Sequence, residues 1–317
     1  MRPIPVGVVG VGALGRHHAR HLASFDNTEL VGVHDIDRER GTSVAKSVGS
    51  TFYPDLDRLL AKVEAVTVAV PTAVHAQVGL HALGRGRAVL MEKPLASSLV
   101  EADALIAAAA LAGVPLQVGH VERFNRALRA ARPFLGEIKY FESTRLAPFQ
   151  SRGTDVAVLL DLMIHDLDLM LHLSRGAPVS EVRASGIAVL TPHLDIANAR
   201  VEFEGGAVAN ITASRVARER VRRLRLFQAD GYLSLDLAAG TGVFMRLRSG
   251  RPDSMASSLD EIVEVVNLEA PEGDALGDEL ASFVASVRGE LVGVVSGAEG
   301  RAALALALRV GEAVVRV

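Results

Sequence analysis

The chain has 317 residues, a formal net charge of −3 and no cysteine, and 49% of its residues are hydrophobic. The length favours two domains with substantial cores. The lack of cysteine excludes disulfides, thiolate metal sites and a cysteine nucleophile, and the small net charge gives no overall field for nucleic acid or anionic lipid. We recognise no signal peptide or membrane span. We therefore expect a cytoplasmic enzyme that binds neither nucleic acid nor a membrane.

Residues 1–119 alternate between strand and helix patterns. Ile4–Val9 and Ala65–Val70 are apolar runs of the kind found in strands that are covered on both faces. Helical stretches lie between such runs, and one of them, Leu99–Ala112, is stopped by Gly113. The alternation predicts an α/β domain with a parallel sheet, ending at Gly119.

Residues 120–317 show a different pattern. Helices are predicted at Glu122–Leu135 and Val156–Leu173, and repeated strands with turn residues between them follow from Val179 to Val266. Two further helices close the chain. Consecutive strands joined by short turns favour an antiparallel sheet, so an α+β domain is predicted here.

A glycine-rich turn follows the first predicted strand. Its sequence, Gly10-Val11-Gly12-Ala13-Leu14-Gly15, matches G-x-G-x-x-G with a strand before it and a helix after it. The first glycine of such a turn allows the tight bend, the second lets the backbone approach a pyrophosphate, and the third lets the helix pack closely. The helix N-terminus then attracts the phosphates. The spacing alone is also compatible with a turn that binds no ligand.

An acidic residue supports the interpretation as a dinucleotide site. Asp35 ends the second predicted strand, twenty residues after Gly15. A carboxylate there can bond a ribose diol and repels a 2′-phosphate, so NAD is preferred over NADP. Arg38 and Arg40 could hold such a phosphate, or could simply begin an exposed helix.

The triplet Glu92-Lys93-Pro94 follows the apolar run Ala88–Met91 directly. Oxidation of an alcohol needs one group that takes the hydroxyl proton and another that stabilises the developing alkoxide. A lysine that is desolvated or lies near other cations can meet either need. The alternative is an ordinary surface lysine before a turn proline.

A second cluster lies within the predicted helix Val156–Leu173. Asp161 and His165 are four residues apart and would share a face that Asp168 extends, whereas Asp166 would point elsewhere. A carboxylate beside an imidazole orients it and stabilises its protonated form, which makes His165 a candidate acid/base. The same residues could equally form a surface ion pair. No third ligand lies nearby in the sequence, so we expect no metal.

Two smaller groups could belong to the site. Pro71, Thr72 and His75 follow the fourth strand, at the edge where open α/β sheets bind ligands. Thr72 could instead cap the next helix. Between the domains, Arg123 could pair with an anionic substrate or serve as a structural arginine.

Taken in chain order, these residues resemble the Gfo/Idh/MocA oxidoreductase family. The resemblance rests on the glycine turn, Asp35, Pro71-Thr72 with His75, Glu92-Lys93-Pro94, and Asp161 with His165. It implies a Rossmann domain that binds NAD or, less expectedly, NADP. It also implies a C-terminal α+β domain with an open, mainly antiparallel sheet, through which members form homodimers or homotetramers.

The resemblance also implies roles for single residues. Lys93 would contact the reacting hydroxyl of a sugar or cyclitol, and His165, assisted by Asp161, would be the acid/base. Glu92 would lie near the nicotinamide ribose. The cofactor-binding residues expected on this basis are Gly10, Gly12, Ala13, Leu14, Gly15, Asp35, Pro71, Thr72, His75 and Glu92.

Within the family, Gly119–Asn125, Asp161–Asp168 and Ala213–Val216 resemble enzymes that oxidise the 3-hydroxyl of a UDP-N-acetylhexosamine to a ketone. Arg126 departs from the proline that such enzymes would have. The substrate-binding residues implied are Arg123, Asn125, Arg145 and Asp168. The substrate's diphosphate would give a use to arginines between positions 215 and 225; alternatively, these side chains alternate along a half-solvated strand.

Two other functions are compatible with these features. The first is a dehydrogenase of a free sugar or inositol. The second is a protein that senses NAD without turnover, although a sensor would need neither Lys93 nor the Asp161–His165 pair.

Overall fold

Two compact units make up the chain. The structure, a computed structural model, describes residues 2–150, 156–248, 263–270, 272–290 and 293–316. The first unit contains residues 1–121 and 275–304, and the second contains residues 122–274 and 305–317. Residues 275–304 thus belong to the first unit, whereas the predicted boundary at Gly119 assigns them to the second domain.

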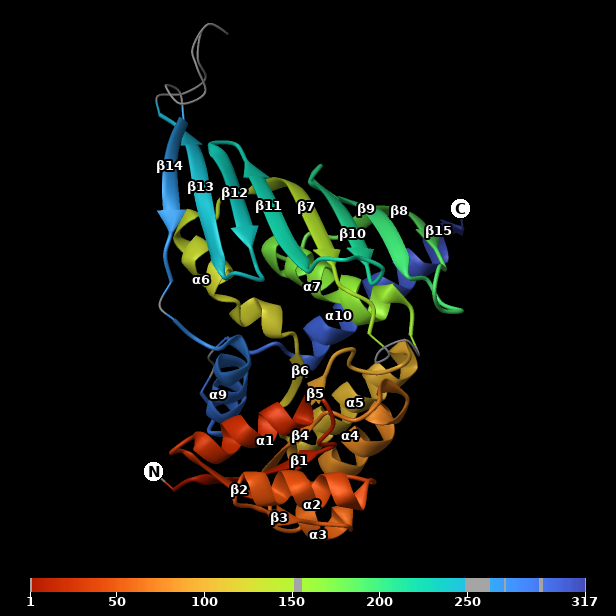
Figure 1. Ribbon diagram of the computed structural model, residues 1–317, viewed down its shortest axis with the longest axis vertical. Helices are drawn as coiled ribbons and strands as arrows, with labels where there is room; N and C mark the ends of the chain where they lie inside the picture. Colours follow the sequence, from red (N-terminus) through yellow and green to blue (C-terminus); the bar gives the residue numbers. More distant parts are fainter. Residues whose placement is uncertain (1, 151–155, 249–262, 271, 291–292, 317) are drawn as a thin grey trace, which may run out of the picture. The chain divides into compact units, whose positions relative to one another are not determined.

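Six parallel strands form the sheet of the first unit, in the order β3-β2-β1-β4-β5-β6 (Figure 1). They are β1 (Ile4–Val9), β2 (Thr28–His34), β3 (Thr51–Phe52), β4 (Ala65–Val68), β5 (Ala88–Glu92) and β6 (Leu116–Gly119). The order runs outward in both directions from β1 and β4. In such doubly wound sheets, ligands bind beyond the carboxyl ends of the strands at this reversal. The predicted parallel α/β domain is confirmed.

Local sequence explains where the helices of this unit begin and end. The helices between the strands are α1 (Gly15–Ser24), α2 (Arg38–Ser47), α3 (Leu56–Leu60), α4 (His75–Leu83) and α5 (Leu99–Ala112). The side chains of Asp37, Asp55 and Ser98 accept hydrogen bonds from first-turn N–H groups of α2, α3 and α5. Gly113 ends α5 in the left-handed conformation, with a φ of 65°. The stop at Gly113 is as predicted.

Helix α9 (Ala275–Val287) completes the core of the first unit, although it lies near the end of the chain. Leu280, Phe283 and Val284 are fully buried in the same hydrophobic cluster as Val8 and Leu90 of the sheet. Burial of a side chain of this size contributes about 1.5–3 kcal/mol. The apolar face of α9 is therefore an integral part of this core, which explains the difference from the predicted boundary.

A nine-stranded sheet forms the second unit, in the order β14-β13-β12-β11-β7-β10-β9-β8-β15. Its strands are β7 (Ile138–Leu146), β8 (Val179–Ile187), β9 (Ile196–Phe203), β10 (Val208–Ser214), β11 (Val221–Gln228), β12 (Gly231–Asp236), β13 (Thr241–Leu247), β14 (Val263–Leu268) and β15 (Val314–Arg316). Neighbours are antiparallel except for β7 with β10 and β8 with β15. The predicted mainly antiparallel sheet is confirmed. The central strand β7 is absent from the predicted strands, because Ser143 and Arg145 place polar groups on its buried face too.

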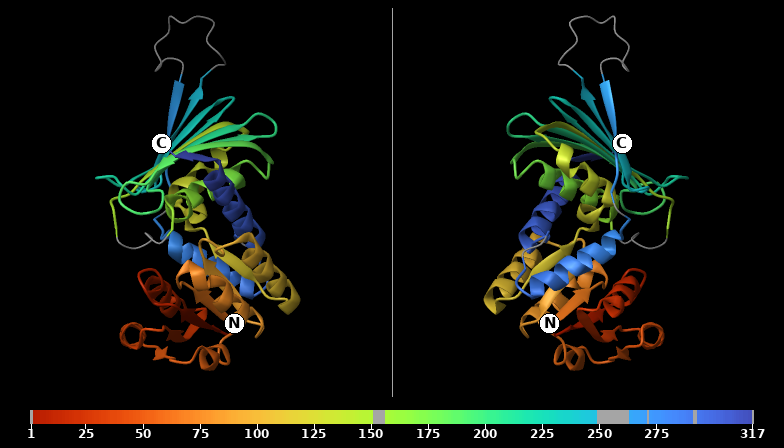
Figure 2. Two further views of the ribbon diagram at one scale, coloured as in Figure 1. Left: turned by 90° about the vertical axis from the view of Figure 1, so that its right-hand side faces the viewer. Right: turned by 90° about the vertical axis from the view of Figure 1, so that its left-hand side faces the viewer.

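One face of this sheet carries helices. Helices α6 (Arg126–Ala131) and α7 (Ile164–Leu173) lie against it (Figure 2), and α10 (Gly297–Ala313) is divided between the two units. In the described parts of the chain, no helix lies against the opposite face. There, Tyr140, Phe227 and Tyr232 form a row across neighbouring strands, with ring centroids 5.7 and 5.2 Å apart.

Two predicted helices are interrupted. The segment Glu122–Leu135 consists of the 3-10 turns η2 (Val121–Phe124) and η3 (Arg132–Phe134) on either side of α6. Asn125 separates η2 from α6, because its side chain caps α6 by accepting a hydrogen bond from the Ala127 N–H. The segment Val156–Leu173 contains a π-helix, η4 (Leu159–Met163), before α7. Among the described residues, no helix is both long and apolar enough to cross a bilayer.

Candidate active site

The glycine-rich turn has room for a pyrophosphate. Gly10 has a φ of 82°, which favours glycine, and a Cβ atom on Gly15 would lie 1.8 Å from the Gly10 carbonyl oxygen. A Cβ atom on Gly12 would instead meet nothing within 4 Å, so the space beside this residue is open to a ligand. Leu14 precedes α1 without capping it, which leaves the helix N-terminus suited to an anion. The turn therefore fits a dinucleotide.

Asp35 lies against this turn. Its buried carboxylate accepts hydrogen bonds from the backbone N–H groups of Val11 and Asp37, both at 2.8 Å. Arg40 donates two more, from Nε at 3.0 Å and from Nη2 at 2.6 Å. Burial opposes ionisation of Asp35, but the bonds from Arg40, Asp37 and Val11 outweigh it and lower the pKa. Each oxygen already accepts two bonds, so a ribose hydroxyl would have to displace part of the Arg40 fork.

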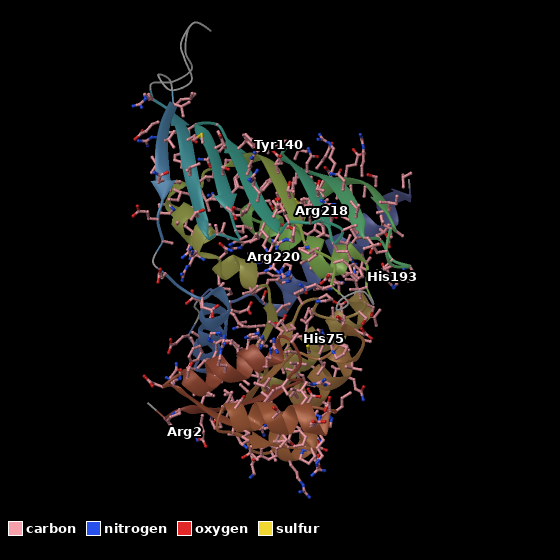
Figure 3. The ribbon with its side chains drawn as sticks, in the orientation of Figure 1. Arg2, His75, Tyr140, His193, Arg218 and Arg220 are labelled. Atoms are coloured by element: carbon pink, nitrogen blue, oxygen red, sulfur yellow. The ribbon has the colours of Figure 1, made fainter. Side chains whose placement is uncertain are left out.

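His75 connects the end of β4 to the Lys93–Pro94 turn. Its buried ring, labelled in Figure 3, places Nε2 at 2.9 Å from the Val70 carbonyl oxygen. Nδ1 lies 2.8 Å from the Pro94 carbonyl oxygen. Burial lowers the pKa of His75, against the raising influence of these carbonyl groups. Both ring nitrogens of His75 are thus engaged with backbone carbonyl groups, which indicates a supporting role. Direct contact of His75 with the cofactor stays a prediction.

Pro71 and Thr72 lie at the more accessible part of this edge. Pro71 is the N-cap residue of the 3-10 helix η1 (Thr72–Val74), which leads into α4. The alternative interpretation, in which Thr72 caps the next helix, is therefore wrong. Pro71 is exposed and Thr72 is half-buried, so both can reach a ligand at the end of β4.

The carboxylate of Glu92 is held from several sides at the end of β5. Nε2 of His18, a fully buried residue on α1, lies 3.0 Å from Oε1, and the Lys93 backbone N–H donates to Oε2 at 3.2 Å. A Cβ atom on Gly119 of the neighbouring strand would lie 3.0 Å from Oε1. Burial raises the pKa of Glu92, but His18 and Lys93 outweigh it and lower the pKa.

His18 is not among the predicted site residues. The signal for it is its place on the buried face of α1, three residues after Gly15. Lys93, in contrast, is predicted, and the structure places it half-buried at the carboxyl end of β5, before a cis peptide bond to Pro94. Ligands of doubly wound sheets bind at this edge, so Lys93 is well placed for its predicted contact.

The second unit carries Asp161 and His165 on a distorted helix. Asp161 lies in η4, where the Ile164 N–H bonds to the Leu159 carbonyl oxygen across the wider π-helical ring. His165 is the second residue of α7, and both side chains are half-buried. The two residues belong to one continuous helical segment, as predicted, but not to a regular α-helix. Single π-helical turns are frequent at functional sites.

Two buried arginine–carboxylate pairs lie beside this helix. Arg123 donates to Asp168 from Nη2 at 2.6 Å and from Nε at 2.8 Å. Arg145 donates to Asp166 from Nε at 2.6 Å and from Nη2 at 3.1 Å. None of the four side chains is more than 7% exposed. Asp166 thus points into the unit. Substrate binding by Arg123, Arg145 and Asp168 stays a prediction, and a substrate would have to compete with these internal hydrogen bonds.

Glu122 extends the second pair into a network. Its Oε1 accepts from Arg145 Nη1 at 2.8 Å and from Arg222 Nη1 at 3.3 Å. Asn125 donates from Nδ2 to Glu122 Oε2 at 3.0 Å and to the Leu237 carbonyl oxygen at 2.8 Å. Burial raises the pKa of Glu122, but the charges of Arg145 and Arg222 outweigh it and lower the pKa. Asn125, predicted to bind substrate, thus has both amide atoms engaged within the protein.

Both units match parts of one protein family. Residues 4–120 match the Gfo/Idh/MocA domain described as "Oxidoreductase family, NAD-binding Rossmann fold". Residues 129–234 match the Gfo/Idh/MocA C-terminal domain. The two matches follow the chain in the order in which the two sheets occur.

Comparison with individual proteins covers almost the whole chain. A UDP-N-acetylglucosamine 3-dehydrogenase from Acidithiobacillus ferrooxidans is 39% identical, over 97% of this chain and 96% of that one. A solved structure of this dehydrogenase superposes with a TM-score of 0.91, covering 99% of this chain and 98% of that one. Myo-inositol 2-dehydrogenase from Thermotoga maritima is 26% identical, over 95% of this chain and 93% of that one. An inositol dehydrogenase homologue from Azotobacter vinelandii, complexed with NADH and myo-inositol, shares the fold, with a TM-score of 0.83, 23% identity and coverage of 98% and 95%.

Proposed function

The chain belongs to the Gfo/Idh/MocA family of NAD-binding oxidoreductases, and on this basis we propose that it oxidises the 3-hydroxyl of a UDP-N-acetylhexosamine to a 3-keto sugar. The observation that carries the proposal is the 39% identity, over 97% of the chain, to a UDP-N-acetylglucosamine 3-dehydrogenase. The inositol dehydrogenase from Thermotoga maritima is more distant, at 26%. We place the reaction in the cytoplasm.

The first unit supplies the residues for NAD, which when bound accepts a hydride from the sugar carbon. In this proposal the turn from Gly10 to Gly15 holds the pyrophosphate, Asp35 bonds the adenosine ribose, and Glu92 bonds the nicotinamide ribose. The open space beside Gly12 and the fixed carboxylate of Glu92 support these roles.

Lys93 and His165 are proposed to act on the reacting hydroxyl. The Lys93 ammonium donates a hydrogen bond to the oxygen and stabilises the negative charge that develops there. His165 accepts the hydroxyl proton, and Asp161 orients the imidazole and stabilises the imidazolium that forms. The half-buried positions of all three side chains support this assignment, since partial exclusion of water strengthens such interactions.

Turnover of a substrate panel tests the proposed reaction. The protein is incubated with NAD and UDP-N-acetylglucosamine, UDP-N-acetylgalactosamine, UDP-glucose, N-acetylglucosamine or myo-inositol, while NADH absorbance is followed. A ketone acceptor is included so that tightly held NADH does not mask turnover. We expect turnover of UDP-N-acetylhexosamines. Turnover of myo-inositol alone would contradict the substrate, and NADH binding without any turnover would indicate a sensor.

A substitution of His165 tests the acid/base assignment. His165→Asn should lower kcat about 10²–10⁴-fold, the usual contribution of a general base, and leave NADH affinity unchanged. His193→Asn is the matched control, because His193 is an exposed histidine of the same unit (Figure 3). A His165 variant as active as the parent would reject the assignment.

The uncovered face of the second sheet supports a homodimer or homotetramer. The aromatic row continues into Met245 and Val265 on the next two strands. An apolar row on a face without covering helices is typical of a surface that binds a second copy. Light scattering should therefore show an oligomer for the parent and smaller species for Phe227→Arg. A parent that is monomeric at micromolar concentration would contradict this part.

A further inference from the structure

A pocket beside Asp161 is lined mainly by arginines. It has a volume of about 90 Å³, and all its lining residues belong to the second unit. Its charged and amide side chains are those of Arg145, Gln150, Asp161, Arg215, Arg220 and Arg222. The roles proposed above leave Arg215, Arg220 and Arg222 unassigned.

Two of the four arginines are fixed by carboxylates of the protein. Arg145 donates to Asp166 and Glu122, as described above. Buried Arg215 donates from Nη2 to the Val156 carbonyl oxygen at 2.6 Å, and its Nε lies 3.5 Å from Asp195 Oδ1. These two arginines therefore form the pocket wall.

Arg222 is less completely neutralised. It lies directly opposite Arg145 across β11 and β7, a position in which like charges repel. Both arginines share Oε1 of Glu122, at 3.3 Å from Arg222 and 2.8 Å from Arg145. Burial lowers the pKa of Arg222, and the cations Arg145 and Arg220 lower it further, against the raising influence of Glu122. An anion among these groups would relieve the repulsion.

Arg220 brings a further cation to the same pocket. Arg220, labelled in Figure 3, directly precedes β11, and its side chain is exposed. It lines the pocket together with Arg222. The planar guanidinium group matches the geometry of phosphate oxygens and can bind them with two parallel hydrogen bonds. In this pocket, Arg145 and Arg215 are held by hydrogen bonds within the protein. Arg220 and Arg222 can direct their N–H groups toward a ligand.

We propose that Arg220 and Arg222 bind the diphosphate of the nucleotide-sugar substrate, an inference that rests on the proposed function. At about 90 Å³, the pocket is much smaller than the clefts of about 300 Å³ or more that enclose drug-sized ligands, so it can hold only part of a nucleotide sugar. The nucleoside and the sugar would therefore lie outside the pocket. Asp161 lines the pocket as well, so a diphosphate held here brings the attached sugar next to the proposed acid/base pair.

Binding of UDP tests this subsite without requiring turnover. Calorimetry is performed with saturating NADH, so that UDP cannot enter the dinucleotide turn. Arg220→Ala and Arg222→Gln should each raise the Kd for UDP about 10- to 100-fold, because each removes a charged hydrogen-bond donor. Arg218→Ala is the matched control, since Arg218 is exposed and two residues away but outside the pocket lining. Binding of uncharged uridine should respond to none of the three.

The outcomes separate this inference from the function on which it rests. UDP affinity unchanged in Arg220→Ala and Arg222→Gln, or lowered equally by Arg218→Ala, overturns the subsite even if the parent oxidises UDP-sugars. A parent that binds no UDP overturns it too. A parent that binds UDP through these arginines but oxidises only myo-inositol overturns the proposed function and keeps the subsite. If Arg222→Gln fails to fold, the exposed position of Arg220 still allows the test.

Discussion

The two units use the same arginine–carboxylate pairing in different surroundings. In the second unit, the side chains of Arg145 and Asp166 are 3% and 1% exposed. In the first unit, Asp35 is 3% exposed, but its partner Arg40 is 44% exposed. Loss of one partner of a buried pair costs several kcal/mol, because a charge stays behind without water. Asp35 is buried too, but it keeps two backbone N–H donors, and loss of the half-exposed Arg40 would let water reach its carboxylate, so this loss costs far less. The pair in the second unit is therefore part of the core, whereas Arg40 can exchange its carboxylate for a ligand.

Removal of Arg145 should have the largest effect. Arg145→Ala leaves Asp166 and Glu122 buried without their shared cation, so the free energy of unfolding should fall by about 3–5 kcal/mol. Urea denaturation followed by circular dichroism measures this. Arg225→Ala is the control, since its pair with Glu142 on the uncovered face is 38% and 40% exposed and should cost at most about 1 kcal/mol. Equal losses in the two variants would remove the distinction between core and surface pairs.

Substitution of His18 should have an intermediate effect. His18→Leu deprives the buried Glu92 carboxylate of its imidazole contact, which should cost about 1–3 kcal/mol of stability and raise the pKa of Glu92. NADH fluorescence titration should show weaker binding, because a displaced or protonated carboxylate no longer accepts from the ribose. His18→Gln keeps a donor and should restore most of the affinity. Parent-like NADH binding in the Leu variant would show that Glu92 needs no such support.

Acid should weaken the second unit through Glu122. The pKa of Glu122 is lower in the folded state, so its contribution to stability is complete above the ordinary glutamate pKa of about 4.3. That contribution is lost as the pH falls through the lower folded pKa. Urea denaturation at a series of pH values from 6 downward should show this decline, and Glu122→Gln should flatten it. An equally steep decline in the variant would assign the acid sensitivity to other carboxylates.

Removal of Arg40 should have the smallest effect on stability and a measurable one on cofactor choice. Arg40→Ala should cost less than about 1 kcal/mol. It also frees two acceptor positions on Asp35 for the ribose diol and removes a cation that could hold a 2′-phosphate. The ratio of kcat/KM for NAD to that for NADP should therefore rise, by about tenfold if one charged hydrogen bond is involved. Arg38→Ala, at the exposed start of α2, is the control; a ratio that moves equally in both variants would argue against a specific role for Arg40.

The dinucleotide turn could be predicted because its requirements are local. Gly10, Gly12 and Gly15 meet backbone constraints within six consecutive residues. Arg145 and Asp166, in contrast, are 21 residues apart in the chain. Their mutual neutralisation depends on how α7 packs on β7, which no local pattern encodes. The sequence therefore indicates Arg145 as a candidate substrate-binding residue, through the family resemblance, but not its dependence on Asp166, which is predicted to point elsewhere.

The arginines of β11 show the same limit within one strand. Alternation correctly separates Arg223 and Arg225 from Leu224 and Leu226. Only the pairing of β11 with β7 places Arg222 opposite Arg145. Similarly, the spacing of Asp161 and His165 predicts a helix, but the π-helical turn that contains Asp161 depends on tertiary packing.

Because Phe283 and its neighbours on α9 belong to the core of the first unit, that unit cannot complete its core until α9 has been synthesised. A ribosome releases residues 1–121 well before it makes residues 275–304, yet the NAD-binding unit contains both. During that interval the apolar surface of the first sheet that α9 will cover stays exposed. Exposed apolar surface makes nascent chains prone to aggregate or to bind chaperones. A premature stop codon anywhere before α9 would therefore damage the domain encoded at the opposite end of the message.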